Sequence, residues 1–330
     1  MVQVSSMPDN ARPAAPFAGF WRRVAAFVVD AFVLGFIGYA LGLVFFDTFV
    51  RLGPWGRCVG FVVALAYFVP QECGRGGGQS LGKRLLRICV VDAQGRALGP
   101  ARSVARFVVF GVPYFLNGAV LPMNLATFAG GFPLALLALG GMLALAYLLA
   151  FNRRTRQSLH DLAVGAFVVR VEDGARLAPA PVRMWGGHRA IAGGLIVLCG
   201  ATPLLFPQLM RMPMFAGLQA LSLRLAAQPE LRSVNVFESA GRVYGRESVG
   251  MRNELLIQAT IAAPLADNVP LSTRLAGIAL SVLPQAARED RISVRLAHGF
   301  DIGIAASWTY NELSLTPAQW ADRVAAGVGD

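Results

Sequence analysis

Long apolar runs separated by short basic segments dominate the first two thirds of the chain. We predict five transmembrane helices from this pattern, at about residues 24–46, 55–70, 107–123, 131–151 and 190–207. The first run, Val24 to Phe46, holds 23 residues. At about 1.5 Å per residue it is long enough to cross a hydrocarbon core of about 30 Å. The second run is short, and we expect it to span by local thinning of the bilayer, by extension into Gln71 to Cys73, or by packing away from lipid.

The last 123 residues follow a different pattern, typical of a water-soluble domain. Leucines at helical spacing predict amphipathic helices at about 215–227 and 271–287. Alternating or β-branched segments predict strands at about 233–237, 254–261, 292–296 and 302–309, with a further segment at 242–249 and a hairpin turn near Gly299. Thr316-Pro317 is typical of a helix start. Residues 208–330 are therefore predicted to form a two-layer α+β domain with an antiparallel sheet.

Composition and charge agree with a membrane protein that carries a modest soluble part. The chain has 330 residues, of which 55% are hydrophobic and 15% charged, and its formal net charge is +11. Residues 208–330 hold 11 basic and 11 acidic side chains, so the whole positive excess lies in residues 1–207. Basic residues beside apolar runs are orientation signals and contacts for anionic lipid headgroups. We therefore expect the lipid bilayer, and no nucleic acid, as the partner of this region.

The basic segments also predict the topology. Residues 71–106 and 152–189 are rich in arginine and belong in the cytoplasm. With residues 1–19 as a disordered cytoplasmic tail and 172–189 as a cytoplasmic linker, five spans place residues 208–330 outside the membrane. The β-prone runs 88–91 and 166–171 each need a partner, and we predict that they pair in a small cytoplasmic sheet.

Asp30 is the one ionisable residue inside the first apolar run. A carboxylate at the centre of a membrane helix costs about 2.5 to 3.5 kcal/mol, so something must offset it. Arg23 lies on the same helix face, but its side chain leans away toward the helix N-terminus, which argues against direct pairing. A basic partner from elsewhere, a water-filled pocket and protonation of Asp30 remain open, as do a structural role and a role in moving an ion.

Basic residues after the fourth run supply candidate partners for Asp30. Arg153, Arg154 and Arg156 return the chain to the cytoplasm, and together with His160 they are the possible charge partners. Asp161 follows them, next to His160, in a segment expected at the membrane surface. A surface salt bridge, a helix cap and a place at the mouth of an ion site are the alternatives for Asp161. Asn117 and Asn124 are candidates either for helix-to-helix hydrogen bonds or for lining a path.

Three sequence features resemble a known family. They are Arg23-x-x-Ala26-x-x-x-Asp30, the segment Gln79-Ser80-Leu81-Gly82-Lys83 followed by Ile88-Cys89-Val90-Val91, and Leu159-His160-Asp161-Leu162 ahead of Phe167-Val168-Val169. Together they resemble the RDD family of bacterial membrane proteins, named for one arginine and two aspartates. The resemblance covers residues 20–171 and implies a four-span module, a bacterial inner-membrane location, transport as the suggested activity, and Arg23, Asp30 and Asp161 as the functional residues. Ala166 departs from the family, whose members often carry Thr there.

Other chemistry is excluded by the pattern of polar residues. Gly77-x-x-x-x-Gly82-Lys83 lacks the Ser or Thr that would follow Lys83 in a phosphate-binding loop, and an apolar span precedes it where a strand is required. Cys58, Cys73, Cys89 and Cys199 show no CxxC spacing, and the three histidines lie far apart in sequence, so neither a metal nor another cofactor is expected. Residues 208–330 show no paired nucleophile and base, and Glu289, Asp290 and Asp301 are expected to be solvated loop acids. We expect no enzyme activity.

Two functions remain. The first is transport or conduction of a small ion or ligand, with Asp30 as the intramembrane acid, Arg23 adjusting its charge and Asp161 at the cytoplasmic mouth. The second is a non-transporting scaffold or accessory protein, whose periplasmic domain at residues 208–330 binds a protein partner or a second copy of itself.

Overall fold

The computed structural model describes residues 17–117, 134, 136–172, 175–176, 184–210, 213–244, 249–264 and 268–327. These residues divide into two compact units. Those of the first unit lie within Met1–Leu34, Val62–Asn117 and Leu137–Leu198, and those of the second unit lie within Gly35–Phe61, Gly118–Leu136 and Cys199–Asp330. Each unit is described by itself.

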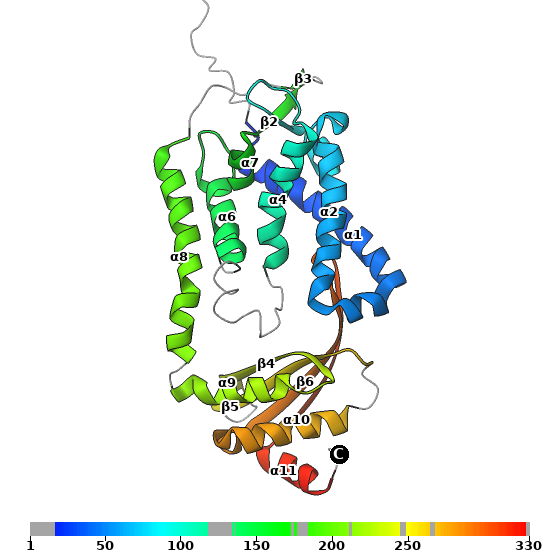
Figure 1. Ribbon diagram of the computed structural model, residues 1–330, viewed down its shortest axis with the longest axis vertical. Helices are drawn as coiled ribbons and strands as arrows, with labels where there is room; N and C mark the ends of the chain where they lie inside the picture. Colours follow the sequence, from blue (N-terminus) through cyan, green and yellow to red (C-terminus); the bar gives the residue numbers. More distant parts are fainter. Residues whose placement is uncertain are drawn as a thin grey trace, which may run out of the picture. The chain divides into compact units, whose positions relative to one another are not determined.

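Helices occur at all five positions where apolar runs predicted them. They are α1 (Phe20–Leu52), α2 (Gly56–Glu72), α4 (Pro100–Leu116), α6 (Gly141–Phe151) and α8 (Gly186–Met210), labelled in Figure 1. The short turn η1 (Gly53–Trp55) joins α1 to α2, and a π-helical turn, η3 (Leu136–Gly140), precedes α6. In the part of the chain that the structure describes, one continuous helical stretch, Phe20–Glu72, is long and apolar enough to cross a membrane. Five spans therefore remain a prediction, and Asn124 lies outside the described residues.

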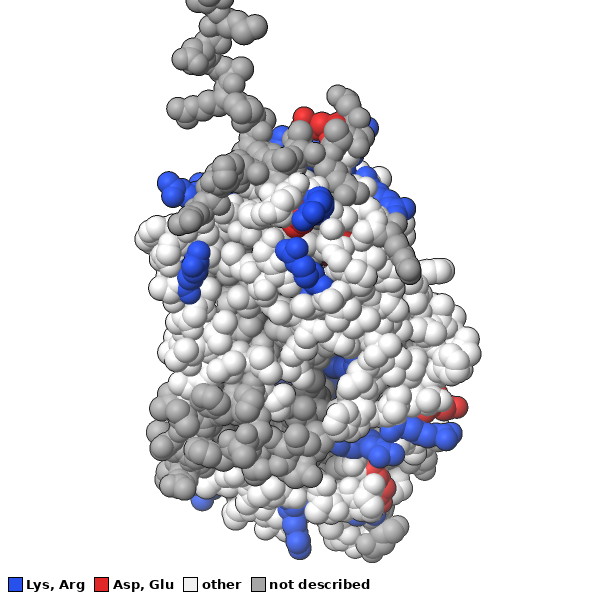
Figure 2. Space-filling view, turned by 45° about the horizontal axis from the view of Figure 1, so that its top comes forward, with Lys and Arg blue, Asp and Glu red and all other residues white. Residues whose placement is uncertain are grey.

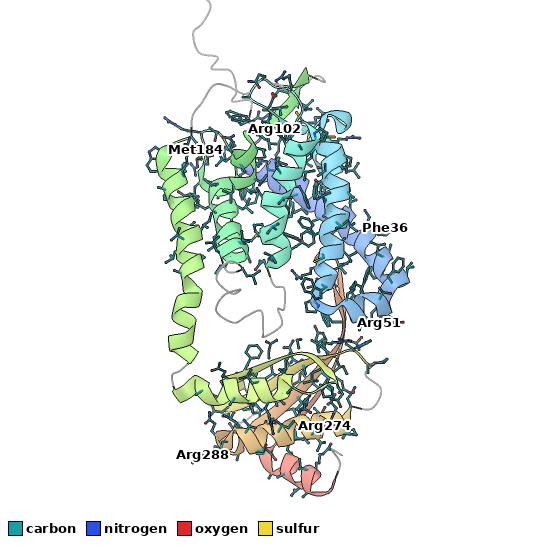
Figure 3. All side chains as sticks on the ribbon, viewed as in Figure 1. Phe36, Arg51, Arg102, Met184, Arg274 and Arg288 are labelled. Carbon is teal, nitrogen blue, oxygen red and sulfur yellow. The ribbon has the colours of Figure 1, made fainter. Side chains whose placement is uncertain are left out.

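One side of α1 carries large apolar residues that the rest of the protein leaves uncovered. Phe32 and Phe36 are each 76% exposed, and Tyr39 lies one turn further on. Phe36 projects outward from α1 in Figure 3. Contiguous exposed aromatic side chains are unusual on a protein surface that faces water. This side of α1 suits a hydrocarbon environment.

A small sheet in the first unit confirms the predicted pairing of its two β-prone runs. Strand β1 (Ile88–Val91) runs antiparallel to β2 (Phe167–Glu172), with Cys89 opposite Val169, and β2 also pairs with β3 (Ala175–Arg176). Phe17 bridges to Val169, and the Ala18 amide donates to the carbonyl of Val168 at 2.9 Å. Residues 17 and 18, which the sequence analysis placed in a disordered tail, are instead attached to this sheet.

Both faces of this small sheet are apolar, which explains why it is buried. One face packs Ile88, Val90 and Val168 against Ala26 of α1, and the other packs Cys89, Val91 and Val169 with Phe17. Two short helices flank the strands: α3 (Leu81–Leu85) precedes β1, and α7 (Leu159–Val164) precedes β2. The small sheet thereby holds α3 and α7 near the N-terminal part of α1.

The second unit has the predicted alternation of helices and strands. Its elements after α8 are α9 (Pro213–Ala226), β4 (Leu231–Tyr244), β5 (Val249–Ile261), α10 (Val269–Val282), the turn η4 (Pro284–Arg288), β6 (Arg291–Asp301), β7 (Ala306–Leu315) and α11 (Pro317–Ala325). The strand order is β4-β5-β6-β7. The outer pairs are antiparallel as predicted, but β5 and β6 are parallel, because α10 carries the chain back across the sheet between them.

One face of this sheet forms the core of the second unit. Alternating residues of β5 and β6, such as Ile257 and Val294, are fully buried against leucines of α9 and α10. Trp320 of α11 is fully buried and its indole N–H donates to the carbonyl of Ile292 at 2.8 Å. Helices therefore cover one face of a four-stranded sheet, the expected two-layer arrangement.

The turn between β6 and β7 lies at residues 302–305, later than the predicted position near Gly299. Just before it, Phe300 is buried against Phe46 and Phe49 of α1. The Asp301 carboxylate forms an ion pair with Arg57 at 2.6 Å and accepts from the Gly303 amide at 2.7 Å. The prediction of a solvated loop acid at Asp301 is therefore wrong. Arg57, near the start of α2, supplies a basic partner that no local sequence pattern reveals.

Candidate functional site

The carboxylate of Asp30 is fully buried and satisfied by neutral donors. It accepts hydrogen bonds from the Tyr67 hydroxyl at 2.7 Å, the Ser80 hydroxyl at 2.5 Å and the Gly82 amide at 2.8 Å. No basic side chain forms an ion pair with Asp30 among the residues described. A basic partner, one of the options open from the sequence, is thus not found there; three well-placed donors offset much of the cost of burial instead.

The segment from Gln79 to Lys83 is shaped to hold Asp30. Ser80 is the N-cap residue of α3, and its side chain turns toward Asp30 rather than toward its own helix. Gly82 packs directly on α1, since a Cβ at this position would lie 2.1 Å from the carbonyl oxygen of Ala26 and 3.0 Å from the Asp30 Cγ. Only glycine allows α3 to approach this closely. The motif therefore fixes α3 on α1 through Asp30.

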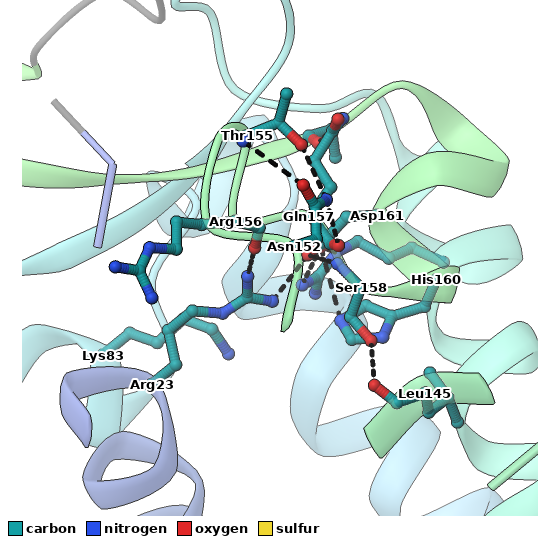
Figure 4. Close-up of polar contacts among 12 residues, drawn as sticks. Arg23, Lys83, Leu145, Asn152, Thr155, Arg156, Gln157, Ser158, His160 and Asp161 are labelled. Atoms are coloured by element: carbon teal, nitrogen blue, oxygen red, sulfur yellow. Dashed lines mark hydrogen bonds and ion pairs between the residues drawn. The ribbon is translucent and has the colours of Figure 1, made fainter. Parts of the chain in front are cut away.

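Arg23 pairs with the second aspartate of the pattern. Its Nη2 lies 2.5 Å from the Asp161 Oδ2, and its Nη1 donates to the carbonyl of Arg156. Figure 4 shows Arg23 reaching from α1 to the loop of Arg156 and to Asp161. Asp161 also caps its own helix α7, because it accepts from the Ser158 amide at 3.1 Å in a capping box. Of the roles open for Asp161, helix cap and salt bridge are both observed.

Arg106 joins Asp161 to a further acid. Its Nη2 and Nε lie 2.7 Å and 3.0 Å from the Asp161 Oδ1, and its Nη1 pairs with Glu72 at the end of α2. Lys83 pairs with the other oxygen of Glu72 at 2.5 Å. We call Arg23, Glu72, Lys83, Arg106 and Asp161 the charge cluster. Lys83 also donates to Ser80 at 3.2 Å, which connects the charge cluster to Asp30.

The charge cluster is almost dry. The exposed fraction of its side chains is 0% for Asp161, 6% for Glu72, 7% for Arg106, 8% for Arg23 and 14% for Lys83. Buried ions are tolerated only where partners replace water, and here each oxygen of both acids has a basic partner. Burial would raise the pKa of Asp161, but Arg23, His160 and Arg106 hold it well below its usual range. Asp161 therefore stays ionised at neutral pH.

His160 lies beside the charge cluster without being charged. Burial lowers the pKa of His160 to about 3, with Arg106 and Arg23 acting in the same direction, although the nearby Asp161 carboxylate opposes them. Its Nε2 is 3.3 Å from the Asp161 Oδ1, and its Nδ1 is buried without a hydrogen-bond partner in the described structure. His160 is therefore neutral at physiological pH and lies against the Asp161 carboxylate.

A cavity of about 280 Å³ opens beside the charge cluster. Its charged and titratable lining residues include Arg23, Glu72, Lys83, Arg106 and His160. Most of its other lining residues are apolar or aromatic and come from α1, α2, α4 and α6, including Phe27, Phe68, Phe107, Phe110, Tyr114, Met142 and Leu145. Neither Asp30 nor Asp161 lines the cavity, because both are turned into the protein. Within the described residues, Glu72 is the one carboxylate that does.

The other predicted charge partners lie elsewhere. Arg153 and Arg154 are exposed, and neither contacts Asp30. Arg156 contributes its carbonyl oxygen to Arg23, while its own guanidinium lines a different cavity with Arg153. Arg23 does not adjust the charge of Asp30 by direct pairing, since its guanidinium is engaged by Asp161 and Arg156. No group of three His, Cys, Asp or Glu side chains in the described ranges could hold a metal ion.

Sequence reasoning missed Glu72, Lys83 and Arg106. All three lie in residues 71–106, which the sequence predicts to be a basic cytoplasmic loop. A signal was present for two of them: Arg106 directly precedes an apolar run and Glu72 lies two residues after one, and an acid at such a place needs a partner. Lys83 lies inside the motif Gln79 to Lys83, but no local pattern links it to an acid 11 residues earlier.

Residues 17–165 match the sequence model of the RDD family. This stretch contains the charge cluster, Asp30 and the cavity-lining helices, so the N-terminal part of the chain is an RDD family domain, as the resemblance implied. An RDD family domain indicates a membrane protein, in agreement with the exposed apolar side of α1. No curated protein and no solved structure matches the chain closely enough to be compared with it.

Proposed function

We propose that the RDD family domain moves a small cation across a bacterial inner membrane, and that Glu72 is the carboxylate to which this cation binds. The observation that carries the proposal is that Glu72 supplies the carboxylate facing the cavity, whereas Asp30 and Asp161 do not line it. A cation in a cavity whose other lining residues are apolar, neutral or basic needs an anionic oxygen ligand. Glu72 offers one within reach of the cavity space.

The pairing of Glu72 suggests how a cation would bind, namely by replacing Lys83 at one carboxylate oxygen. Arg106 holds one oxygen of Glu72 and keeps its contacts with Asp161. Lys83 holds the other oxygen with a compact ammonium on a flexible stem, and it is the most exposed member of the charge cluster. An incoming cation competes with Lys83 for this oxygen. Lys83 keeps Ser80 as an acceptor when it is displaced.

In this proposal the arginine and the two aspartates position other groups rather than contact the ion. Asp30 holds Ser80 and Gly82, and thus the segment that carries Lys83. Arg23 and Asp161 hold α7 and orient Arg106 toward Glu72. The predicted topology belongs to the same proposal: five spans, a cytoplasmic N-terminus with the charge cluster on the cytoplasmic side, and a periplasmic domain at residues 208–330.

The test is cation flux in proteoliposomes that contain the purified full chain, with imposed Na⁺, K⁺ or H⁺ gradients. We expect Glu72→Gln to abolish flux. We expect Lys83→Gln to lower the half-saturating cation concentration, because the internal competitor is gone. Glu172→Gln is the matched control, since Glu172 is an exposed acid of the same unit that lies away from the cavity. Absence of flux from the parent protein, or full flux from monodisperse Glu72→Gln, would refute the proposal.

A scaffold or accessory function is the second candidate, and the exposed edge of the second unit's sheet favours it. Strand β7 lies at the edge of the sheet, and its residues 306–312 are exposed, including Tyr310 at 55%. An exposed edge strand with aromatic side chains is a common docking surface for another chain. Two results together would support this function. The parent protein would show no cation flux, and a protein partner that co-purifies with the full chain would be lost in the Tyr310→Lys variant.

A further inference from the structure

A second cavity, of about 720 Å³, lies in the first unit and is distinct from the cavity beside the charge cluster. Its wall combines the start of α1, the end of α6, the following loop and β2. The residues that matter for its chemistry are Trp21, Arg22, Phe151, Arg153, Arg156 and Arg170. We call it the arginine cavity. Arg22 lines it, whereas the adjacent Arg23 lines the first cavity, because successive helical residues point in different directions.

The arginine cavity differs from the charge cluster in having no anion. Four arginines line it, and its lining contains no acidic residue. None of the four guanidinium groups has a carboxylate partner in the part of the chain that the structure describes. The Arg170 Nε is buried with no hydrogen-bond partner there. Four cations gathered without a counter-charge repel one another, and a bound anion would relieve this repulsion.

The loop that supplies two of these arginines is rigidly built. The Asn152 side chain donates to the Thr155 hydroxyl at 2.8 Å and to the carbonyl of Gln157 at 2.9 Å. Arg156 has a φ of 56°, a left-handed conformation that is rare for residues other than glycine. It is held there by the carbonyl contact to Arg23 and by its own amide, which donates to Asn152 at 3.0 Å. The loop therefore places Arg156 at the cavity rather than leaving it to solvent.

The residues around the arginines indicate the kind of anion. Guanidinium groups bind phosphate oxygens in pairs, and the N-terminal end of α1, where Gly19 and Phe20 line the cavity, favours an anion at the same place. Trp21 is 78% exposed and Phe151 is 60% exposed, and each adjoins a long apolar run. Exposed aromatic residues at such positions lie at the level of lipid headgroups. Basic side chains are also prominent in Figure 2, next to a broad uncharged surface.

We propose that the arginine cavity binds the phosphate of an anionic phospholipid headgroup. A lipid headgroup and a soluble metabolite can both carry the phosphate ester that the arginines would bind. The exposed aromatic residues favour the lipid, since a soluble phosphate ester would not use them. This binding does not depend on cation transport and would hold equally for a scaffold.

The experiment is native mass spectrometry of the delipidated full chain, mixed with phosphatidylglycerol and phosphatidylcholine in competition. The test variant is Arg22→Gln with Arg153→Gln, which removes two charges from the cavity. The matched control is Arg84→Gln with Arg154→Gln, which removes two exposed charges of the same unit that do not line the cavity. Size-exclusion profiles of both variants verify that they fold.

We expect the parent protein to retain phosphatidylglycerol in preference to phosphatidylcholine. We expect the test variant to bind it about tenfold or more weakly, since each basic residue near an anionic surface contributes measurably, and the control to stay within about twofold of the parent. Equal retention of both lipids by the parent, or an equal loss in both variants, would overturn the proposal. A second measurement compares the binding of glycerol 3-phosphate, a soluble phosphate ester, with that of phosphatidylglycerol. Binding of this soluble ester more tightly than phosphatidylglycerol would overturn the lipid assignment.

Discussion

Replacing Asp161 by Asn tests whether the charge cluster stabilises the first unit. The substitution keeps the size of the side chain and removes the negative charge that faces Arg23 and Arg106. Both arginines are at most 8% exposed, so water does not replace the lost partner. Breaking a buried ion pair from one side costs about 3 to 5 kcal/mol. Arg106 keeps Glu72, so we expect the lower end, about 3 kcal/mol, or roughly a 100-fold shift in the opening equilibrium.

The assay uses Cys89, which is fully buried in β1 and reacts with a thiol reagent only when the small sheet opens. Cys58, Cys73 and Cys199 are replaced by alanine in every protein compared, so that Cys89 reports alone. Glu312→Gln is the control, because it removes a charge from an ion pair with Arg295 whose two side chains are each 38% exposed, and such surface pairs contribute about 0 to 1 kcal/mol. Labelling of Cys89 in Asp161→Asn less than about tenfold faster than in the parent would refute this reasoning.

Three further predictions follow from other contacts. Gly82→Ala places a Cβ 2.1 Å from the Ala26 carbonyl oxygen and should lower the yield of monodisperse protein, whereas Gly99→Ala, with no atom within 4 Å of its Cβ, should not. Phe300→Ala should destabilise the second unit by about 3 to 5 kcal/mol, measured by resistance to proteolysis, and the half-exposed Phe237→Ala should cost far less. His160 resists protonation in the folded state, since its pKa falls from 6.5 to about 3, so stability of the first unit should be full above pH 6.5 and fall by about 1.4 kcal/mol per pH unit below it. His160→Gln should flatten the dependence of stability on pH between pH 6.5 and 4, where Asp161 is still ionised. An unchanged slope would mean that another group causes the pH dependence.

Local patterns in the sequence predicted the elements well. Apolar runs of sufficient length locate α1, α2, α4, α6 and α8, and alternation locates the strands of the second unit. The pairing of β1 with β2 was predictable because each is an isolated β-prone run that needs a partner. The parallel pairing of β5 with β6 was not, since it depends on the path of α10 rather than on the pattern of either strand.

The partners in the site were harder to predict than its members. Arg23, Asp30 and Asp161 stand out because charged residues in or beside apolar helices are rare. Their partners are set by the fold: Arg23 and Asp161 are 138 positions apart, and Asp30 is bound by Tyr67 and Ser80, which are neutral and attract no notice in a search for opposite charges. Asp30 accepts hydrogen bonds from hydroxyl and amide donors, whereas Arg23 pairs with Asp161.

The charge cluster also constrains how the first unit assembles. Its members come from α1, α2, α3, α4 and α7. Among the described residues that form the charge cluster, Glu72 is the one acid in place before α7 docks. Three cations sharing one carboxylate in a dry site would be unstable, so these side chains must stay hydrated until Asp161 arrives. Because β2 follows α7 directly, pairing of β2 with β1 brings Asp161 into place. The small sheet and the charge cluster should therefore form together, and variants that weaken the sheet, such as Val168→Asp, should expose Cys89 to thiol reagents to the same extent as Asp161→Asn or more.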